Sequence, residues 1–163
     1  MSSRLPITEL SSHWQEQLRT AVTSTPELLQ LLDLREDQLD WLEGDTAGFA
    51  LKVPHSFVRR MHRGDPDDPL LRQVLATPDE KLATPGYSTD PVGEQDNANP
   101  VPGLIHKYRG RLLLVVAGGC AVNCRYCFRR HFPYEDNRNG RRDWQAAYDY
   151  IRAQGDIEEV IFS

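Results

Sequence analysis

LLLVVAGGCAVNCRYC, residues 112–127, joins a continuous apolar run to three closely spaced cysteines. The apolar part, 112–117, is typical of a strand that is buried on both faces of a parallel sheet. Gly118-Gly119 then allows the backbone to turn sharply. A short loop needs little extra closure entropy to bring its thiols onto one small object. Three thiols lie in such a loop here, those of Cys120, Cys124 and Cys127. The stretch therefore predicts a buried strand followed by a loop of metal ligands.

The residues after this loop predict a helix and a second buried strand. Asp143 is placed to cap a helix that ends at Gly155, and the strand runs over 159–162. One face of the helix carries Trp144, Ala147, Tyr148 and Ile151. Strand, loop, helix and strand form a βαβ unit, in which chemistry takes place at the carboxyl ends of the strands, where the cysteines lie. Because one such unit cannot cover a parallel sheet, we expect the sequence to stop after Ser163 partway through a larger α/β domain.

Residues 1–76 predict a helical amino-terminal region. Apolar residues recur at helical spacing over 10–22, and Thr25-Pro26-Glu27 is typical of an N-cap and first turn. Shorter helices are predicted over 54–63 and 69–76. The region is interpreted as a packing domain without chemistry. Its histidines are scattered without ligand partners, and they are His13, His55 and His62.

A connector rich in proline and glycine is predicted over 77–103, since it has little capacity for helix or sheet. The domain organisation expected from sequence is therefore a helical region over 1–76, this connector, and an incomplete βαβ part over 104–163.

Composition excludes several classes of protein. The chain has 163 residues and a net charge of -5, which argues against a nucleic-acid binder. Its three cysteines leave no complete disulfide set, and no signal peptide or apolar run of ~18 residues is present. We therefore expect a cytoplasmic protein with reduced thiols and no membrane contact. Arginines crowd around the cysteines and favour a small anionic ligand there: Arg125, Arg129, Arg130, Arg138, Arg141 and Arg142.

Three metal hypotheses remain at this point. Zinc would need a fourth ligand, which only His106 or His131 could supply, and neither belongs to a second cysteine pair. A structural or redox thiol cluster is the second hypothesis. A 4Fe-4S cluster on the three cysteines is the third, and it would leave one iron open to a non-protein ligand. An open iron favours catalysis over simple electron transfer.

The pattern Cys120-x3-Cys124-x-Tyr126-Cys127 resembles the signature of radical S-adenosylmethionine (SAM) enzymes. Three neighbouring stretches narrow the resemblance to the lysine 2,3-aminomutase family, in its bacterial branch that supplies β-lysine for modification of elongation factor P. They are Asp90-Pro91-Val92-Gly93-Glu94, Asn99-Pro100-Val101-Pro102-Gly103-Leu104-Ile105-His106-Lys107-Tyr108 and Cys127-Phe128-Arg129-Arg130-His131-Phe132-Pro133-Tyr134.

The resemblance implies a fold and a reaction. The fold is the start of a radical SAM barrel, a partial TIM-like parallel barrel, preceded by the helical region and truncated after its second strand. The enzyme would be an isomerase that converts L-lysine to β-lysine by a 1,2-amino shift. Its cofactors would be the 4Fe-4S cluster, SAM, which yields a 5'-deoxyadenosyl radical, and pyridoxal 5'-phosphate (PLP), which holds lysine as an imine.

The resemblance also implies roles for particular residues. Tyr126 would lie beside the SAM adenine, and Ser163 begins a motif that helps to bind the SAM amino group. Arg129 matches the arginine that pairs with the substrate carboxylate, although a structural salt bridge is its alternative. Lys107 and Arg111 match basic positions near the PLP phosphate, and their alternative is a pair of solvated charges.

Other parts of the family's site are not expected within this sequence. Its lysines are Lys52, Lys81 and Lys107, whereas the family's Schiff-base lysine and the acids that hold the substrate amino groups lie beyond residue 163. We therefore expect this amino-terminal fragment to be inactive alone. Expected partners are lysine, a reductant such as flavodoxin or ferredoxin, and a functional link to a β-lysine ligase and elongation factor P, while a homo-oligomer stays open. A radical SAM aminomutase for another amino acid, or a non-catalytic zinc or iron–sulfur module, are the alternatives.

Overall fold

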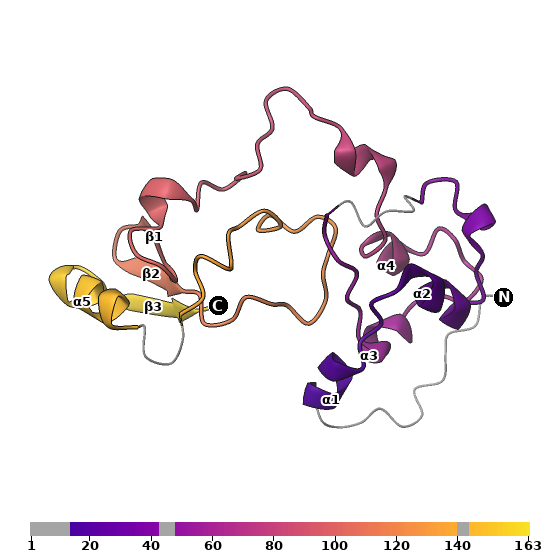
Figure 1. The fold of residues 1–163 in the computed structure, drawn as a ribbon, viewed down its shortest axis with the longest axis horizontal. Coiled ribbons are helices and arrows are strands. Elements are labelled where there is room, and N and C mark those ends of the chain that lie inside the picture. The colour runs from indigo at the N-terminus through magenta and orange to yellow at the C-terminus, as the bar shows by residue number, and fades with distance from the viewer. Residues whose placement is uncertain (1–13, 43–47, 140–143) are drawn as a thin grey trace. The chain divides into compact units, whose positions relative to one another are not determined.

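The structure, a computed structural model, describes residues 14–42, 48–139 and 144–163 (Figure 1). These residues form two compact units. The helical unit comprises the described residues up to Pro85 together with Cys120–Cys127, and the sheet unit comprises Gly86–Gly119 and Phe128–Ser163. The predicted part 104–163 therefore contributes to both units. Its cysteine loop is the segment that belongs to the helical one.

Short helices build the helical unit. They are α1 (Trp14–Arg19), α2 (Thr25–Leu31), α3 (His55–Val58) and α4 (Pro69–Arg72), with 3-10 turns at Glu36–Gln38 and Pro78–Lys81 (Figure 1). Buried residues from these helices and from the segments between them make one core that includes Val22, Leu28, Leu32, Met61, Leu71 and Leu75. Each helix is short, so its stability comes from this shared core more than from its own backbone hydrogen bonds.

The helices differ in detail from those predicted. The described part of the first predicted helix covers only α1, and residues 10–13 lie outside the described residues. The N-cap of α2 is Ser24, one residue before the predicted Thr25, and Pro26 lies in the first turn as expected. The helices predicted over 54–63 and 69–76 are longer than α3 and α4, which replace them in the structure. α3 gives way to tight turns that lead to Gly64 at φ 69°, and α4 ends at its C-cap Gln73.

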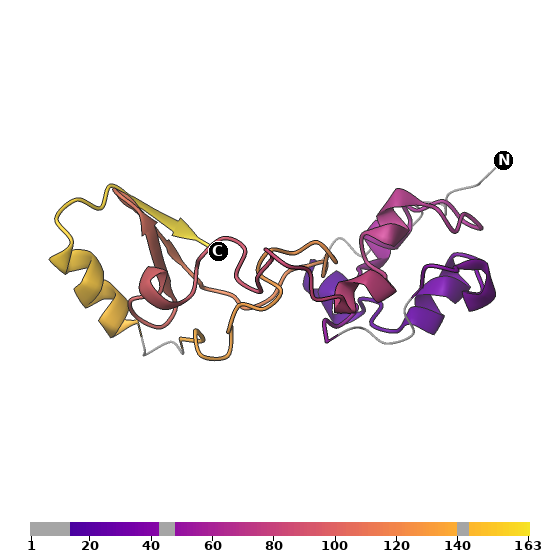
Figure 2. The same cartoon turned by 90° about the horizontal axis from the view of Figure 1, so that it is seen from above.

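A three-stranded sheet forms the second unit, with the order β1 (Leu104–Tyr108), β2 (Arg111–Leu114) and β3 (Glu159–Phe162). β1 and β2 form an antiparallel hairpin, and β3 is parallel to β2 with Leu112 opposite Val160. The connection from β2 to β3 contains α5 (Gln145–Ala153), which lies along one face of the sheet (Figure 2). The predicted βαβ order is therefore confirmed, whereas β1 is an antiparallel strand that the sequence analysis missed.

The sheet corrects two predictions about burial. The first predicted strand ends at Leu114 instead of Ala117, because the N–H groups of Val116 and Ala117 both turn to the carbonyl of Ser163. β3 was expected to be buried, but its residues are exposed and Phe162 retains 72% of its accessible surface. Among the described strands β3 lies at one edge of the sheet and pairs only with β2.

Helix α5 packs on the sheet through a face close to the predicted one. Ala147 is buried against Leu104, Leu112 and Leu114, and Trp144 and Ile151 pack beside it. Tyr150 completes this face, while Tyr148 is 49% exposed and was wrongly assigned to it. The predicted cap Asp143 lies outside the described residues, and the helix ends before Gly155, as expected.

The predicted connector contains two short 3-10 turns, the one at Pro78–Lys81 and another at Asp96–Ala98. Asn137 fastens its end: its buried side chain accepts hydrogen bonds from Asn99 (2.7 Å) and from the N–H of Gly103 (2.8 Å). Gly103 has a φ of 77° and lies against the side chain of Asn139, so a Cβ at this position has no room. In the part of the chain that the structure describes, no helix is long and apolar enough to cross a membrane.

Candidate functional site

The cysteine loop is fastened to the helical unit by residues that lie between its cysteines. The side chain of Val122 packs against the helical core. The N–H and side-chain amide of Asn123 donate to the carbonyls of Lys52 (3.0 Å) and Ala50 (2.9 Å). The N–H of Arg125 donates to the carbonyl of Gln73 at 2.7 Å. The loop is thus held against the extended segment that precedes α3 and against the end of α4.

The Arg125 side chain is the most enclosed part of this attachment. Its Nε and Nη2 atoms form a two-pronged ion pair with Glu80, at 2.9 and 2.5 Å, and Nη1 donates to the carbonyl of Phe49 at 2.6 Å. The Arg125 and Glu80 side chains are only 8% and 13% exposed. Glu80 also accepts the N–H of Thr77 at 3.1 Å, so the carboxylate caps the turn that carries it. The sequence placed Arg125 among the arginines that favour a small anionic ligand, and it indicated no role for Glu80.

The three cysteines are free thiols, with Cys120 exposed and Cys124 and Cys127 half-buried. The N–H of Cys127 donates to the carbonyl of Cys124 at 3.1 Å, which closes a tight turn between them. No cysteine belongs to a cluster of three ligand atoms within 4.8 Å of one another among the described residues. A single zinc ion would need that proximity, whereas a four-iron cluster takes each sulfur on a different iron. The donor set of three thiols fits a four-iron cluster in which one iron would lack a protein ligand.

The histidines considered as zinc ligands or as isolated residues have other surroundings. His106 on β1 shares a hydrogen bond of 2.9 Å with the hydroxyl of Tyr150 on α5, and His131 is exposed. His62 does have partners, contrary to expectation: its ring nitrogen lies 2.9 Å from Asp68, and Asp65 lies near. His13 lies outside the described residues, and His55 begins α3.

Asp68 explains the His62 cluster as a structural device. Its two carboxylate oxygens accept N–H groups of His62, Leu70 and Leu71, and the carboxylate caps α4. Burial raises the pKa of Asp68, but these hydrogen bonds outweigh it, and the pKa lies below its usual value. The carboxylate is thus occupied as a helix cap.

Tyr126 stands on the surface of the cysteine loop with 70% of its side chain exposed. Its hydroxyl donates to the side-chain oxygen of Gln73 at 3.3 Å. The charge of a thiolate at Cys124 raises the pKa of Tyr126, and desolvation and a hydrogen bond with the same residue act in the same direction. The aromatic ring is therefore available to a flat ligand that approaches the loop from solvent.

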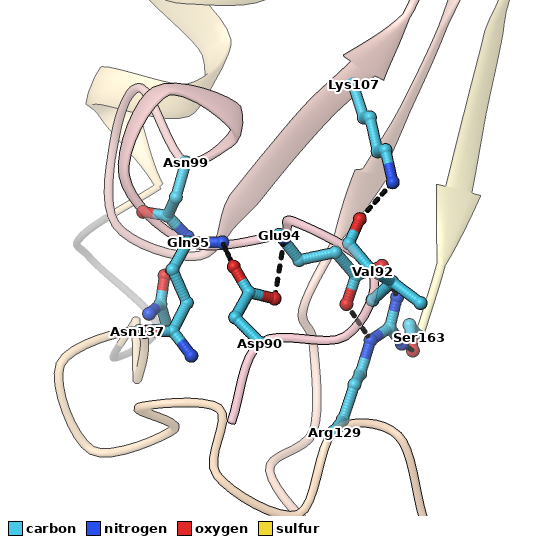
Figure 3. Close-up of polar contacts among 9 residues, drawn as sticks. All are labelled: Asp90, Val92, Glu94, Gln95, Asn99, Lys107, Arg129, Asn137 and Ser163. Carbon is cyan, nitrogen blue, oxygen red and sulfur yellow. Dashed lines mark hydrogen bonds and ion pairs between the residues drawn. The ribbon is translucent and has the colours of Figure 1, made fainter. Parts of the chain in front are cut away.

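In the sheet unit, Arg129 forms a second two-pronged ion pair, with Glu94 (Figure 3). Its Nε and Nη2 lie 2.5 and 2.7 Å from the carboxylate oxygens, and Nη1 donates to the Ser163 hydroxyl at 3.2 Å. The two charged side chains are 16% and 13% exposed. The structure thus joins two predicted site residues, Arg129 and Ser163, and adds Glu94, to which the sequence analysis gave no role. Glu94 belongs to the motif 90–94, but it lies 35 residues from Arg129 and nothing local in the sequence pairs the two.

Asp90 orders the turn that carries Glu94. Its carboxylate accepts the N–H groups of Glu94 (3.0 Å) and Gln95 (3.1 Å), as Figure 3 shows. The hydrogen bond from Glu94 contributes most to lowering the pKa of Asp90 below its usual 3.8, burial opposes it, and the charge of Lys107 adds a smaller lowering. The ionised carboxylate therefore holds Glu94 toward Arg129.

Lys107 and Arg111 line one open pocket of about 300 Å³ on the sheet unit. Glu94, Tyr108, Phe128 and Ile161 are among its other lining residues. The Lys107 ammonium donates to the carbonyl of Val92 (Figure 3), and Arg111 lies 3.5 Å from Glu159 with both side chains more than half exposed. Two cationic side chains thus share a pocket with apolar walls, a surrounding suited to an anionic group on a flat ring.

Comparison with known proteins gives the chain its relatives. It is 55% identical over 153 residues to the L-lysine 2,3-aminomutase of Escherichia coli (strain K12). The aligned region covers 92% of this chain and 44% of that protein. It is 46% identical over 158 residues to the L-lysine 2,3-aminomutase of Haemophilus influenzae, covering 97% and 46%. The L-lysine 2,3-aminomutase of Clostridium subterminale is 28% identical over 151 residues, which cover 92% of this chain and 36% of that protein. No family model matches the chain.

These relatives are named as aminomutases, so the class of protein that the chain is similar to is that of the aminomutases. More narrowly, the predicted resemblance to the lysine 2,3-aminomutase family is confirmed, because relatives at 40–55% identity share this name over at least 92% of the chain. The chain spans less than half the length of the curated relatives that it matches.

Proposed function

We propose that this chain carries the iron–sulfur and SAM site of a lysine 2,3-aminomutase that converts L-lysine to β-lysine. Cys120, Cys124 and Cys127 would hold a 4Fe-4S cluster and leave one iron for SAM. The observation that carries the proposal is the fastened loop with three free thiols, in a chain 55% identical to a named aminomutase. The bound groups would supply radical chemistry from the cluster and SAM, and PLP would hold the migrating amino group.

The chain's own residues would bind and orient these groups. The exposed ring of Tyr126 would cover the adenine, and the Ser163 hydroxyl would accept from the SAM amino group. Arg129 would receive the substrate carboxylate, with Glu94 fixing the plane of the guanidinium. Lys107 and Arg111, which share the pocket of about 300 Å³, would neutralise the PLP phosphate.

We also propose that β2, α5 and β3 begin a parallel barrel of the partial TIM-like kind. Support comes from the parallel pairing of β2 with β3, from the helix between them, and from the exposed Val160, Ile161 and Phe162 on β3. A further strand beside β3, with the helix that would connect to it, would cover these side chains. Cytoplasmic location, a flavodoxin or ferredoxin reductant, and delivery of β-lysine to a ligase that modifies elongation factor P complete the proposal.

Anaerobic reconstitution of the chain with iron and sulfide tests the cluster assignment. We expect a brown protein whose reduced form gives an electron paramagnetic resonance (EPR) signal that changes when SAM is added. Cys124→Ser should lose the cluster, because a hydroxyl is a poor iron ligand. Tyr126→Ala should keep the cluster but weaken the SAM response, while Tyr126→Phe, which retains the ring, is the matched control. A colourless protein that binds one zinc ion and ignores SAM would refute the proposal.

A further inference from the structure

The three thiols belong to the helical unit, because Cys120–Cys127 are part of it. Sequence analysis treated this unit as packing without chemistry. In the structure, however, its segments supply the carbonyl oxygens that hold Asn123 and Arg125 and the carboxylate that holds the Arg125 side chain. The unit is therefore in direct contact with the residues that separate the cysteines.

The Arg125–Glu80 pair has the most hydrogen bonds of these contacts and is nearly buried. Two arginine nitrogens bind the carboxylate, a third binds the carbonyl of Phe49, and the Arg125 carbon Cζ lies 5.5 Å from the centre of the Phe49 ring. Such a pair is a poor source of net stability, since both charges lose water on burial. Its value lies in geometry, because a planar guanidinium held on two sides accepts only one orientation.

The position of Arg125 in the loop gives that geometry a consequence. Arg125 is one of two residues between Cys124 and Cys127, and the N–H of Cys127 bonds to the carbonyl of Cys124 across them. With both the N–H and the side chain of Arg125 fixed to the helical unit, the turn that presents these two sulfurs is fixed as well.

We propose that Glu80 and Arg125 are positioning residues that pre-organise the cysteine loop for its cluster, so that the helical unit is the cradle of the metal site. This inference rests on the proposed cluster on the three cysteines. Neither residue touches iron. Together they act as outer-shell partners, the class of residue whose loss commonly weakens metal binding 10- to 100-fold.

Glu80→Gln is the sharpest variant, because the amide oxygen can still accept the N–H of Thr77 while the charge that holds Arg125 is removed. The matched control is Glu16→Gln, which breaks a two-pronged Arg–Glu pair in the same unit whose side chains are 72% and 44% exposed. Arg125→Lys keeps the positive charge and loses the planar fork. Val58→Ala removes buried core volume elsewhere in the unit and reports the effect of lower stability alone.

The reconstituted chains are compared by the rate at which a chelator removes iron, alongside the melting temperature of each apo form. We expect about 10-fold faster iron loss from Glu80→Gln and Arg125→Lys than from the unsubstituted chain or Glu16→Gln. Val58→Ala should lose iron at close to the unsubstituted rate, even where its melting temperature is as low as that of Glu80→Gln. Should Glu80→Gln not fold, Arg125→Lys carries the same comparison.

Two results would overturn the inference: equal rates for Glu80→Gln and Glu16→Gln, or equally fast loss from Val58→Ala at matched melting temperature. Failure of the unsubstituted chain to form a cluster is a different outcome, because it refutes the proposed function on which the inference rests.

Discussion

Arg125 and Arg129 lie two residues before and two residues after Cys127. Each forms an ion pair with a glutamate from an earlier segment, but the two pairs belong to different units. Arg125 directs its third nitrogen to a backbone carbonyl, which cannot move away without disturbing the chain. Arg129 directs its third nitrogen to the hydroxyl of Ser163, a side chain that can rotate. The Arg125 guanidinium is therefore fixed by its three partners, whereas the third partner of Arg129 can be exchanged for another group.

This difference separates two uses of a buried arginine. A guanidinium satisfied by backbone and carboxylate orders a loop, as Arg125 does. A guanidinium held on one edge by a carboxylate, with a side-chain hydroxyl as its third partner, is oriented but adaptable, which suits a residue that receives a substrate carboxylate. Glu94, which also lines the pocket of about 300 Å³, then has the role of holding Arg129 in plane.

The largest expected effect is that of Arg125→Gln on stability. Loss of the guanidinium leaves the Glu80 carboxylate 13% exposed without its charged partner, and breaking such a pair costs about 3 kcal/mol. Native-state amide exchange should show this loss at Leu28 in the helical unit and not at Leu104 in the sheet unit. The control, Arg35→Gln, breaks an exposed pair and should change stability by less than about 0.5 kcal/mol. An effect on both units alike would contradict the division drawn above.

Arg129→Gln should have a smaller effect, confined to the sheet unit, of about 2 kcal/mol. The reason is that the Arg129 side chain is 16% exposed, against 8% for Arg125, and its third hydrogen bond is longer, at 3.2 Å against 2.6 Å. Combining it with Glu94→Gln removes both charges and should restore part of the stability. Arg138→Gln, in an exposed pair with Glu135, is the control. Should Arg129→Gln prove as costly as Arg125→Gln, the contrast between the two arginines would be lost.

The comparison of the two arginines also shows which features of the fold could be predicted from the sequence. The parallel β2–α5–β3 unit was predictable because apolar runs, helical periodicity and glycines are local signals. The partners Glu80 and Glu94 were not, because they lie 45 and 35 residues from their arginines and leave no periodic trace. The strand β1 was missed because its polar half, His106 to Tyr108, breaks the apolar pattern, and its strand character comes from pairing with β2.

The candidate site was predictable to a similar degree. Cysteine spacing marked the loop, but nothing local indicated that the loop would belong to the helical unit. That assignment depends on carbonyls such as those of Lys52 and Gln73, and every residue type has a carbonyl. The roles of Arg129 and Ser163 were predicted by resemblance, and their contact at 3.2 Å joins residues 34 positions apart, which no local pattern indicates.

The smallest expected effect is a pH dependence of the turn that holds Glu94 toward Arg129. The titrating group is the carboxylate of Asp90. Hydrogen bonds that need the ionised carboxylate place its pKa below 3.8 in the folded chain. The ordering that Asp90 gives is therefore complete above the unfolded pKa near 3.8, and it is lost as pH falls through the lower folded value. Nuclear magnetic resonance should show the amide signals of Glu94 and Gln95 shifting together with a midpoint below 3.8, and Asp90→Asn should abolish that midpoint. A midpoint above 3.8 would mean that the carboxylate does not hold this turn, and that Glu94 reaches Arg129 without its help.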